Sequence, residues 1–310
     1  MNRLSRRSFL HFATLFSVFF AAGILCGAEA QPSPTFQEVK YGPYLRNVLD
    51  VYQPESENPT PVLIYFHGGG FVGGDKSKVK KDLLSQCLDA KIAVVSGNYR
   101  LILGQEAAPF PAPMLDGARA IQFVRSKAKE WNLDPERMAL AGGSAGGCMS
   151  VWLAVHDDLA DPKAEDPVAR ISTRVSCVIG YGAQTSLDPE EIFEKIGGKP
   201  SIHPSLLPFY GAHSREELNS PEKKALIEEA TALHHVGPGD PPMQLRYGGT
   251  LSSAPLSEDA SIGRSIHHPM FGKLLKEAYA PFGLSCELVC DDVPEKRSEI
   301  AFLKACFGMD

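Results

Sequence analysis

A serine flanked by glycines stands in the sequence GGSAG, residues 142–146. The pattern G-x-S-x-G, placed between a strand and a helix, lifts a serine hydroxyl out of a sharp turn. The helix that follows supplies positive potential and free N–H groups for an anion. Ser144 is therefore the candidate nucleophile for attack on a carbonyl carbon. A glycine-rich turn needed only for close packing would give the same letters.

A second glycine run, FHGGGF at residues 66–71, follows the apolar stretch PVLIY. A glycine run that leaves a strand can aim backbone N–H groups at a developing oxyanion, and each such donor is worth roughly 3–4 kcal/mol. The phosphate-binding patterns G-x-x-x-x-G-K-[ST] and G-x-G-x-x-G do not occur. The two motifs together predict a serine-hydrolase scaffold that needs no cofactor.

The segments that must position these motifs alternate in character. Apolar runs typical of buried strands alternate with helical spacing, and this indicates a mainly parallel, doubly wound α/β sheet with helices on both faces. The predicted strands lie within 47–54, 61–66, 92–100, 133–142, 174–181, 242–249 and 285–290, and the predicted helices within 78–90, 115–131, 145–156, 222–232, 269–281 and up to 307. Residues 183–241 lose the rhythm and are rich in Pro, Gly, His and charge. We interpret them as an insertion or lid in a single domain, residues 31–310.

Six segments carry a resemblance to a known family: LDVYQP, FHGGGF, VVSGNYRL, FPAPMLDGARAIQFVR, LDPERMALAGGSAGG and DPPMQLRYG. Together they resemble the α/β-hydrolase superfamily, specifically the esterase and lipase group related to hormone-sensitive lipase and to feruloyl-esterase-like (BD-FAE-like) domains. The resemblance covers about residues 48–156 and 240–249. It implies an α/β-hydrolase fold and the hydrolysis of carboxylic esters.

The same resemblance implies roles for individual residues. Ser144 would be the nucleophile, and His67 would be a structural histidine that holds the glycine loop. The oxyanion hole would be formed by the N–H of Ala145 and by two of three glycines, Gly68, Gly69 and Gly70.

The sequence departs from the family at the partners of the nucleophile. The family places an acid after the strand PMQLRYG in a pattern like H-G-x-x-D, and a histidine after the last strand. Here Tyr247 and Leu251 stand at the two positions of that pattern, and residues 269–310 contain no histidine. Both expected partners are absent from their usual places.

The adjacent pair His267 and His268 offers a replacement base, because it lies near the carboxyl edge of the predicted sheet. Glu258 or Asp259 could orient one of these rings. The alternative is that His268 caps the helix that begins at Pro269.

Other titratable residues are weaker candidates. Asp291, Asp292 and Glu295 follow the last strand, but a carboxylate with a pKa near 4 is a poor base at neutral pH. His203 and His213 would reach the site only if the insertion folds over it. His234 and His235 are interpreted as packing or lid residues.

We expect no metal site, because H-E-x-x-H and C-x-x-C are absent and neighbouring residues of a strand point to opposite faces. Cys87, Cys148 and Cys177 lie in apolar segments typical of the core. Cys286 and Cys290 would lie about 13 Å apart on a strand, too far to pair. One disulfide fits the sequence, whereas a disulfide framework does not.

The N-terminus has the features of an export signal. Arg6 and Arg7 precede an apolar run at residues 12–26, and Ala28 and Ala30 form an A-x-A cleavage site. The paired arginines resemble a twin-arginine signal, so we expect residues 1–30 to be removed and the protein to be periplasmic or extracellular. An ordinary Sec signal or an uncleaved anchor is the alternative. About fifteen apolar residues are short for a span that needs roughly 20, so no membrane span is expected after cleavage.

Two functions remain open at this point. The first is an exported carboxylic-ester hydrolase that acts through Ser144 with an atypical or missing base. The second is a catalytically silent relative that binds a small ester or carboxylate ligand. The net charge of −6 disfavours nucleic acid as a partner.

Overall fold

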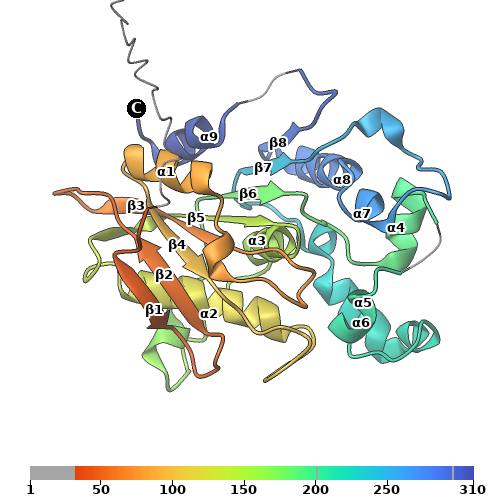
Figure 1. Cartoon of the computed structure of the whole chain (residues 1–310), viewed down its shortest axis with the longest axis horizontal. Coiled ribbons are helices and arrows are strands. Elements are labelled where there is room, and N and C mark those ends of the chain that lie inside the picture. The colour runs from red at the N-terminus through yellow and green to blue at the C-terminus, as the bar shows by residue number, and fades with distance from the viewer. Residues whose placement is uncertain (1–31, 200–201, 295–296) are drawn as a thin grey trace, which may run out of the picture. The chain divides into compact units, whose positions relative to one another are not determined.

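Eight strands form the central sheet of the computed structural model, which describes residues 32–310 except 200–201 and 295–296. The sheet order is β1-β2-β4-β3-β5-β6-β7-β8 (Figure 1). β1 and β2 run antiparallel to their neighbours, and all other neighbouring strands are parallel. The strands are β1 Phe36–Lys40, β2 Val48–Tyr52, β3 Thr60–Phe66, β4 Ala93–Gly97, β5 Leu133–Gly143, β6 Cys177–Tyr181, β7 Met243–Arg246 and β8 Cys286–Val289. The predicted signal, residues 1–30, lies outside the described residues.

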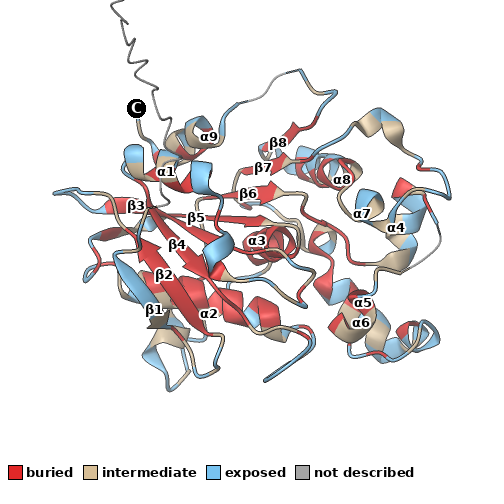
Figure 2. Cartoon of the chain, in the orientation of Figure 1, coloured by how far each residue is buried: buried red, intermediate tan, exposed pale blue. Residues whose placement is uncertain are grey.

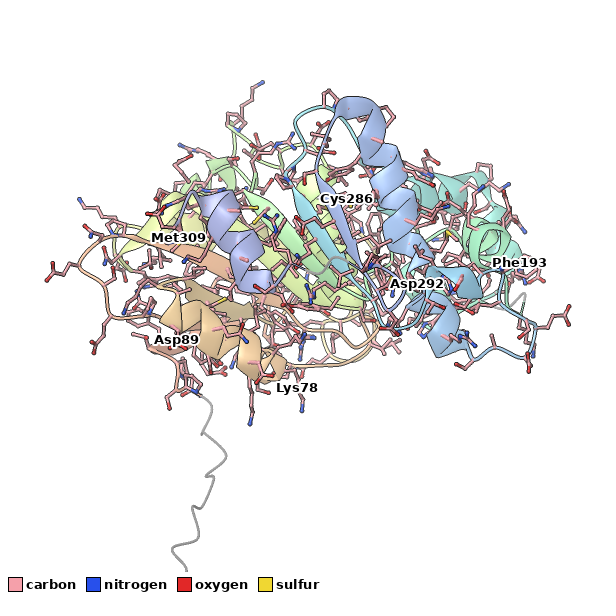
Figure 3. All side chains as sticks on the ribbon, turned by 90° about the horizontal axis from the view of Figure 1, so that it is seen from above. Lys78, Asp89, Phe193, Cys286, Asp292 and Met309 are labelled. Atoms are coloured by element: carbon pink, nitrogen blue, oxygen red, sulfur yellow. The ribbon has the colours of Figure 1, made fainter. Side chains whose placement is uncertain are left out.

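Helices cover both faces of the sheet, and this confirms the predicted fold class. The apolar side chains of α1 (Lys81–Asp89) and α9 (Glu299–Phe307) pack in one layer, and these two helices lie side by side when the molecule is seen from above (Figure 3). The opposite layer is formed by α2 (Ala112–Ser126), α3 (Ala145–Val155) and α8 (Met270–Tyr279). Every residue of β3 is buried, as Figure 2 shows, which explains why its sequence is apolar without alternation.

The region interpreted as an insertion contains short helices. They are α4 (Pro189–Ile196), α5 (Leu206–Phe209), η3 (Glu216–Asn219), α6 (Pro221–Ala230) and η4 (Ala232–His235). A further short helix, α7 (Ile262–Ile266), lies between β7 and α8 and was not predicted. The remaining 3-10 turns are η1 (Lys76–Lys78), η2 (Pro167–Arg170), η5 (Leu251–Ser253) and η6 (Ala280–Phe282).

The strand register brings four loops to one edge of the sheet. Phe66 pairs with Gly142, and Tyr181 pairs with both Gly143 and Arg246. The segments that follow β3, β5, β6 and β7 therefore leave the sheet side by side. This edge collects the glycine loop, the serine turn and the segment that contains the histidine pair.

Two further predictions concern cysteines and membranes. The cysteines within the described residues are free thiols, and Cys87, Cys148 and Cys177 are buried in the core. Among the helices of residues 32–310, apart from the undescribed gaps, none has the length and apolarity required to cross a bilayer.

Candidate active site

Ser144 lies in the sharp turn between β5 and α3, with the backbone angle φ at 50° and ψ at −117°. This is a strained conformation for a residue with a side chain, and it is the one that the nucleophile turn requires. The Ser144 N–H donates to the carbonyl of Tyr181 at 2.7 Å, which ties the turn to β6. Glycine is required at position 146, because a Cβ there would lie 2.1 Å from the carbonyl oxygen of Phe66.

The glycine loop lies directly beside this serine. A Cβ on Gly68 would come within 3.4 Å of the Ser144 Cβ. Gly69 and Gly70 have φ angles of 119° and 60°, in the region that favours glycine. Within the described residues, no hydrogen bond uses the N–H groups of Gly69, Gly70 or Ala145. Ala145 is the first residue of α3, so its N–H has no partner within the helix.

His67 fixes the glycine loop through its side chain. Its Nδ1 lies 2.8 Å from the carbonyl oxygen of Gly68, so Nδ1 carries the proton and donates. Its Nε2 accepts from the Arg46 guanidinium at 3.1 Å, and its ring stacks on Tyr99. Burial lowers the pKa of His67 to about 4, so the ring is neutral at neutral pH. These contacts are those of a structural histidine.

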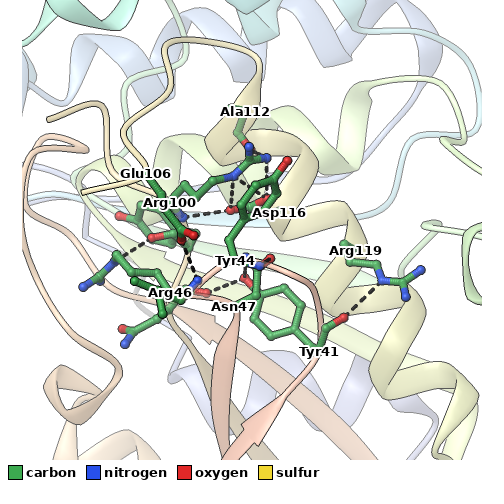
Figure 4. Close-up of polar contacts among 12 residues, drawn as sticks. Tyr41, Tyr44, Arg46, Asn47, Arg100, Glu106, Ala112, Asp116 and Arg119 are labelled. Carbon is green, nitrogen blue, oxygen red and sulfur yellow. Dashed lines mark hydrogen bonds and ion pairs between the residues drawn. The ribbon is translucent and has the colours of Figure 1, made fainter. Parts of the chain in front are cut away.

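The segment that carries Arg46 is itself fixed by polar contacts (Figure 4). The backbone N–H of Leu45 donates to the carboxylate of Glu106. Nearby, the Arg100 guanidinium donates to the carboxylate of Asp116 on α2, with Nη2 at 2.7 Å. The first contact joins the segment of Arg46 to the loop after β4. The second joins that loop to α2, which lies in the same layer as α3.

His267 is the histidine that contacts Ser144. The Ser144 Oγ lies 2.9 Å from Nε2 of His267. The other ring nitrogen, Nδ1, lies 3.0 Å from the carbonyl oxygen of Gly263. A carbonyl only accepts, so Nδ1 carries the proton and Nε2 presents its lone pair to the serine hydroxyl. Burial lowers the pKa of His267, which favours the neutral ring that can accept a proton.

The short helix α7 positions the ring of His267. The Ser261 side chain caps α7 by accepting from the N–H of Arg264, and His267 follows the last residue of that helix. The Gln184 side chain donates to the carbonyls of Gly182 and Ile266, which joins the end of α7 to the loop after β6. A Cβ on Gly182 would lie 3.1 Å from the His267 ring, so the ring packs against backbone.

The structure contradicts the predicted acid. The Asp259 carboxylate accepts from the hydroxyl of Ser257 and is exposed, and Glu258 is exposed as well. Among the contacts of the described residues, neither carboxylate reaches His267. The backbone carbonyl of Gly263 occupies the place where the family would have an acid.

His268 has the role that the sequence analysis gave as the alternative to a base. It is buried, and its Nδ1 accepts from the Met270 N–H at 3.0 Å, which caps the start of α8. Its Nε2 therefore carries the proton and donates to Ser253 Oγ at 2.8 Å. Both ring nitrogens are engaged away from Ser144.

The acidic residues after β8 hold a loop. The N–H of Gly249 donates to Asp291, and the N–H groups of Leu251 and Ser252 donate to Asp292. These backbone hydrogen bonds hold the pKa of Asp292 well below its usual range. Neither carboxylate is placed to act as the base, and Glu295 lies outside the described residues.

Of the other candidate histidines, His203 lies at the site, whereas His213 and His234 do not. His203 lies on the wall of the pocket beside Ser144, so part of the insertion does cover the site. His213 is exposed on a turn, and its N–H donates to Glu217. His234 pairs with Glu228, away from the sheet edge.

Two hollows flank the pair formed by Ser144 and His267. One is a small, mostly apolar pocket of about 50 Å³, lined by Gly70, Phe71, Ser144, Ala145, Gln184, Leu187, Ile192, His203, Ser205, Leu206, Phe209 and Ile266. The other is larger, about 280 Å³, and is lined by Gly248, Gly249, Thr250, Ser253, Arg264, His267, His268 and Pro269. Ser144 lines the first hollow and His267 lines the second.

Known proteins that are similar to this chain include ester hydrolases. The model of the BD-FAE family matches residues 49–259. The chain is similar to the probable carboxylic ester hydrolase LipM of Mycobacterium tuberculosis, with 24% identity over 71% of this chain. It covers 49% of that relative, so it spans about half of its length. It is 25% identical to the ethyl acetate hydrolase of Pseudomonas putida, over 74% of this chain and 73% of that protein.

Among solved structures, the chain is similar to an acetyl ester-xyloside bifunctional hydrolase from Caldicellulosiruptor lactoaceticus. The TM-score is 0.59 and the identity is 24%, over 83% of this chain and 82% of the other. At this identity the likeness supports the fold alone.

Proposed function

The chain belongs to the BD-FAE family of the α/β-hydrolase superfamily, and from that premise we propose that it is a carboxylic-ester hydrolase that acts through a Ser144–His267 dyad. One observation carries the proposal: Ser144 Oγ lies 2.9 Å from a ring nitrogen that must present a lone pair. The serine turn and the unused N–H groups beside it complete the arrangement. The curated relatives that are carboxylic ester hydrolases support the same reaction class.

The reaction follows from these positions. His267 Nε2 takes the hydroxyl proton as Ser144 Oγ attacks the ester carbonyl carbon. The resulting imidazolium then gives that proton to the oxygen of the departing alcohol, and the acyl group stays on Ser144. Water repeats the sequence, so that a carboxylic acid leaves and the serine recovers its proton. Throughout, the Gly263 carbonyl holds Nδ1–H and keeps the ring in the productive tautomer.

The oxyanion hole belongs to the same proposal. The N–H groups of Gly69, Gly70 and Ala145 would donate to the negative charge that develops on the carbonyl oxygen. Support comes from the glycine conformations and from the absence of any other partner for these donors in the described residues. Each donor would stabilise the transition state by roughly 3–4 kcal/mol.

The two hollows suggest which part of an ester lies where. Ser144 faces the pocket of about 50 Å³, which is much the smaller of the two hollows. That pocket would take a short acyl group such as acetyl. His267 lines the larger hollow, where the departing oxygen must meet the ring, so the alcohol would lie there. Its lining of Arg264, Ser253 and loop backbone suits a hydroxylated alcohol.

Export of the protein rests on the sequence of residues 1–30 alone. We propose that a twin-arginine-like signal is removed after Ala30 and that the enzyme acts in the periplasm or outside the cell. Sequencing the N-terminus of the protein from the culture medium or periplasm tests this. A mature chain that still begins at Met1 would contradict it.

The second candidate function is a silent relative that binds an ester or carboxylate. The observation that favours it is the missing carboxylate partner of His267 among the described residues. In that case the pocket and the N–H groups would bind the ligand without turnover.

The test uses wild type and Ser144→Ala with p-nitrophenyl esters of increasing chain length and a fluorophosphonate label. We expect turnover of acetate and labelling in wild type, neither in Ser144→Ala, and kcat/KM falling at least tenfold from acetate to hexanoate. Labelling without Ser144 or equal turnover by both proteins would refute the nucleophile. If wild type neither labels nor turns over but binds acetate, the silent relative is correct.

A further inference from the structure

His156, Glu229 and His235 come together on the surface, away from the proposed dyad. His156 ends α3, the helix that begins at the nucleophile, whereas Glu229 and His235 belong to α6 and η4 of the insertion. One candidate ligand atom from each residue lies within 4.8 Å of the other two. The ester hydrolysis uses none of these side chains. Two imidazoles and one carboxylate form a ligand set that Zn²⁺ prefers.

His156 directs one ring nitrogen at the carboxylate of Glu229. Its Nδ1 lies 2.9 Å from the carbonyl oxygen of Asp157, so Nδ1 carries the proton of the neutral ring. Nε2 then presents a lone pair, yet it lies 3.0 Å from the Glu229 carboxylate. Two acceptors that face each other at this distance repel. A metal ion that is bound by both atoms would turn this contact into an attraction.

His235 has the same kind of support. Its Nε2 lies 2.7 Å from the backbone carbonyl of Glu229, so Nε2 donates and Nδ1 has the free lone pair. Metal-binding histidines usually donate their other N–H to a carbonyl or carboxylate, which fixes the tautomer and orients the ring. His156 and His235 both show this support before any metal is considered.

We propose that His156 Nε2, the Glu229 carboxylate and His235 Nδ1 bind a divalent transition-metal cation, with Zn²⁺ as the best match. Ligand atoms about 2.0–2.2 Å from a tetrahedral zinc lie about 3.4 Å apart, so the 3.0 Å separation of the first two needs only a small adjustment. Water would complete the coordination. The pair alone fits a protonated histidine, but the nearby third residue fits a metal.

The bound metal would join the insertion to the core. Trp152 of α3 already contacts this region, because its indole N–H donates to the carbonyl of Glu229 and its ring lies 4.3 Å from that of His156. A metal would add a bond between α3 and the α6–η4 segment. Ser144 lies roughly 18 Å away along α3, at 1.5 Å per residue, so the metal would stabilise the fold and take no part in the chemistry.

The experiment is a zinc titration of the full protein after treatment with EDTA, followed by calorimetry and by thermal unfolding. We expect one zinc ion per chain and a rise in Tm of about 4 °C or more at 100-fold excess over Kd. Co²⁺ in place of zinc should give the visible bands of tetrahedral cobalt. The titration is repeated in His267→Ala, so that a metal on the active-site imidazoles is not counted.

Matched variants locate the metal. His235→Ala and Glu229→Gln should each weaken zinc binding at least tenfold, whereas His234→Ala should change it less than twofold. His234 is the adjacent histidine, and it pairs with Glu228 instead. Undiminished binding in His235→Ala would overturn the proposal. So would a wild type that binds no zinc and shows no cobalt spectrum, in which case His156 and Glu229 form only a protonated ion pair.

Discussion

Replacing each of the two adjacent histidines in turn would distinguish the proposed base, His267, from a structural residue, His268. His267 accepts from Ser144 at 2.9 Å, whereas His268 accepts from the Met270 N–H and donates to Ser253. The residues are neighbours in the chain, so His267→Ala and His268→Ala are matched in position and in chemistry. They differ in their hydrogen-bond partners and in burial, since His268 is buried and His267 is half-buried.

The expected magnitudes follow from those partners. General-base assistance contributes about 10²–10⁴-fold, so His267→Ala should lower kcat by about 10³-fold, equivalent to about 4 kcal/mol of barrier. His268→Ala removes a helix cap and a buried hydrogen bond, which costs about 1–2 kcal/mol of folding free energy. Its kcat should stay within about threefold of wild type. His268→Asn, which keeps an acceptor for the Met270 N–H, should regain most of the stability.

The assay is p-nitrophenyl acetate hydrolysis under saturating conditions, with urea unfolding on the same samples. The two variants should affect different measurements: His267→Ala should lower kcat, and His268→Ala should lower the free energy of unfolding. A His267→Ala protein that keeps more than a tenth of the wild-type kcat would refute the dyad. A His268→Ala protein that folds normally and loses more activity than His267→Ala would show that the wrong ring was chosen.

Two further predictions concern the pH dependence of activity and the stability contributed by a buried ion pair. Burial lowers the pKa of His267, and the neutral ring is the proposed base, so kcat/KM should fall as the pH drops through a midpoint below the ordinary value of about 6.5 for histidine. A midpoint of 7 or above in the pH–rate profile would contradict this. Asp116→Asn breaks a buried pair with Arg100 and should cost about 3 kcal/mol in urea unfolding. Glu130→Gln, in an exposed pair with Lys127, should cost less than about 1 kcal/mol, and equal costs would refute the argument.

The sheet could be predicted because its strands are buried on both faces. Such strands appear in the sequence as continuous apolar runs, as β3 and β4 do. β1 was not predicted, because most of its residues are exposed and it has no apolar run. α7 has only five residues, and its role depends on where it ends rather than on its composition.

The serine turn and the glycine loop could be predicted for a related reason. Backbone close to backbone excludes side chains, so the geometry leaves glycines in the sequence at positions such as Gly146. The partner of His267 left no such trace. It is a backbone carbonyl, which every residue type has, so no residue type at position 263 could indicate it. The sequence therefore indicated the nearby acidic residues Asp259 and Glu258, which face other groups or solvent.

Choosing between the two histidines was equally beyond the sequence. Adjacent residues point in different directions, and which ring reaches Ser144 depends on the exact end of α7 and the start of α8. The cluster of His156, Glu229 and His235 needs tertiary contact as well, because its members come from the core and from the insertion. No spacing rule could bring them together.

The carbonyl partner of His267 decides whether the missing acid implies a silent protein. In a serine-hydrolase triad the acid both fixes the tautomer of the imidazole and stabilises the imidazolium. Replacing the acid by an amide costs about 10⁴-fold, because the amide can hold the wrong tautomer. The Gly263 carbonyl has no N–H to offer, so it holds only the productive tautomer. What is lost is the negative charge, and the loss should therefore be smaller than that of the amide replacement. The proposed dyad then retains the part of the triad on which proton transfer from Ser144 depends, and we therefore expect a slow but active hydrolase.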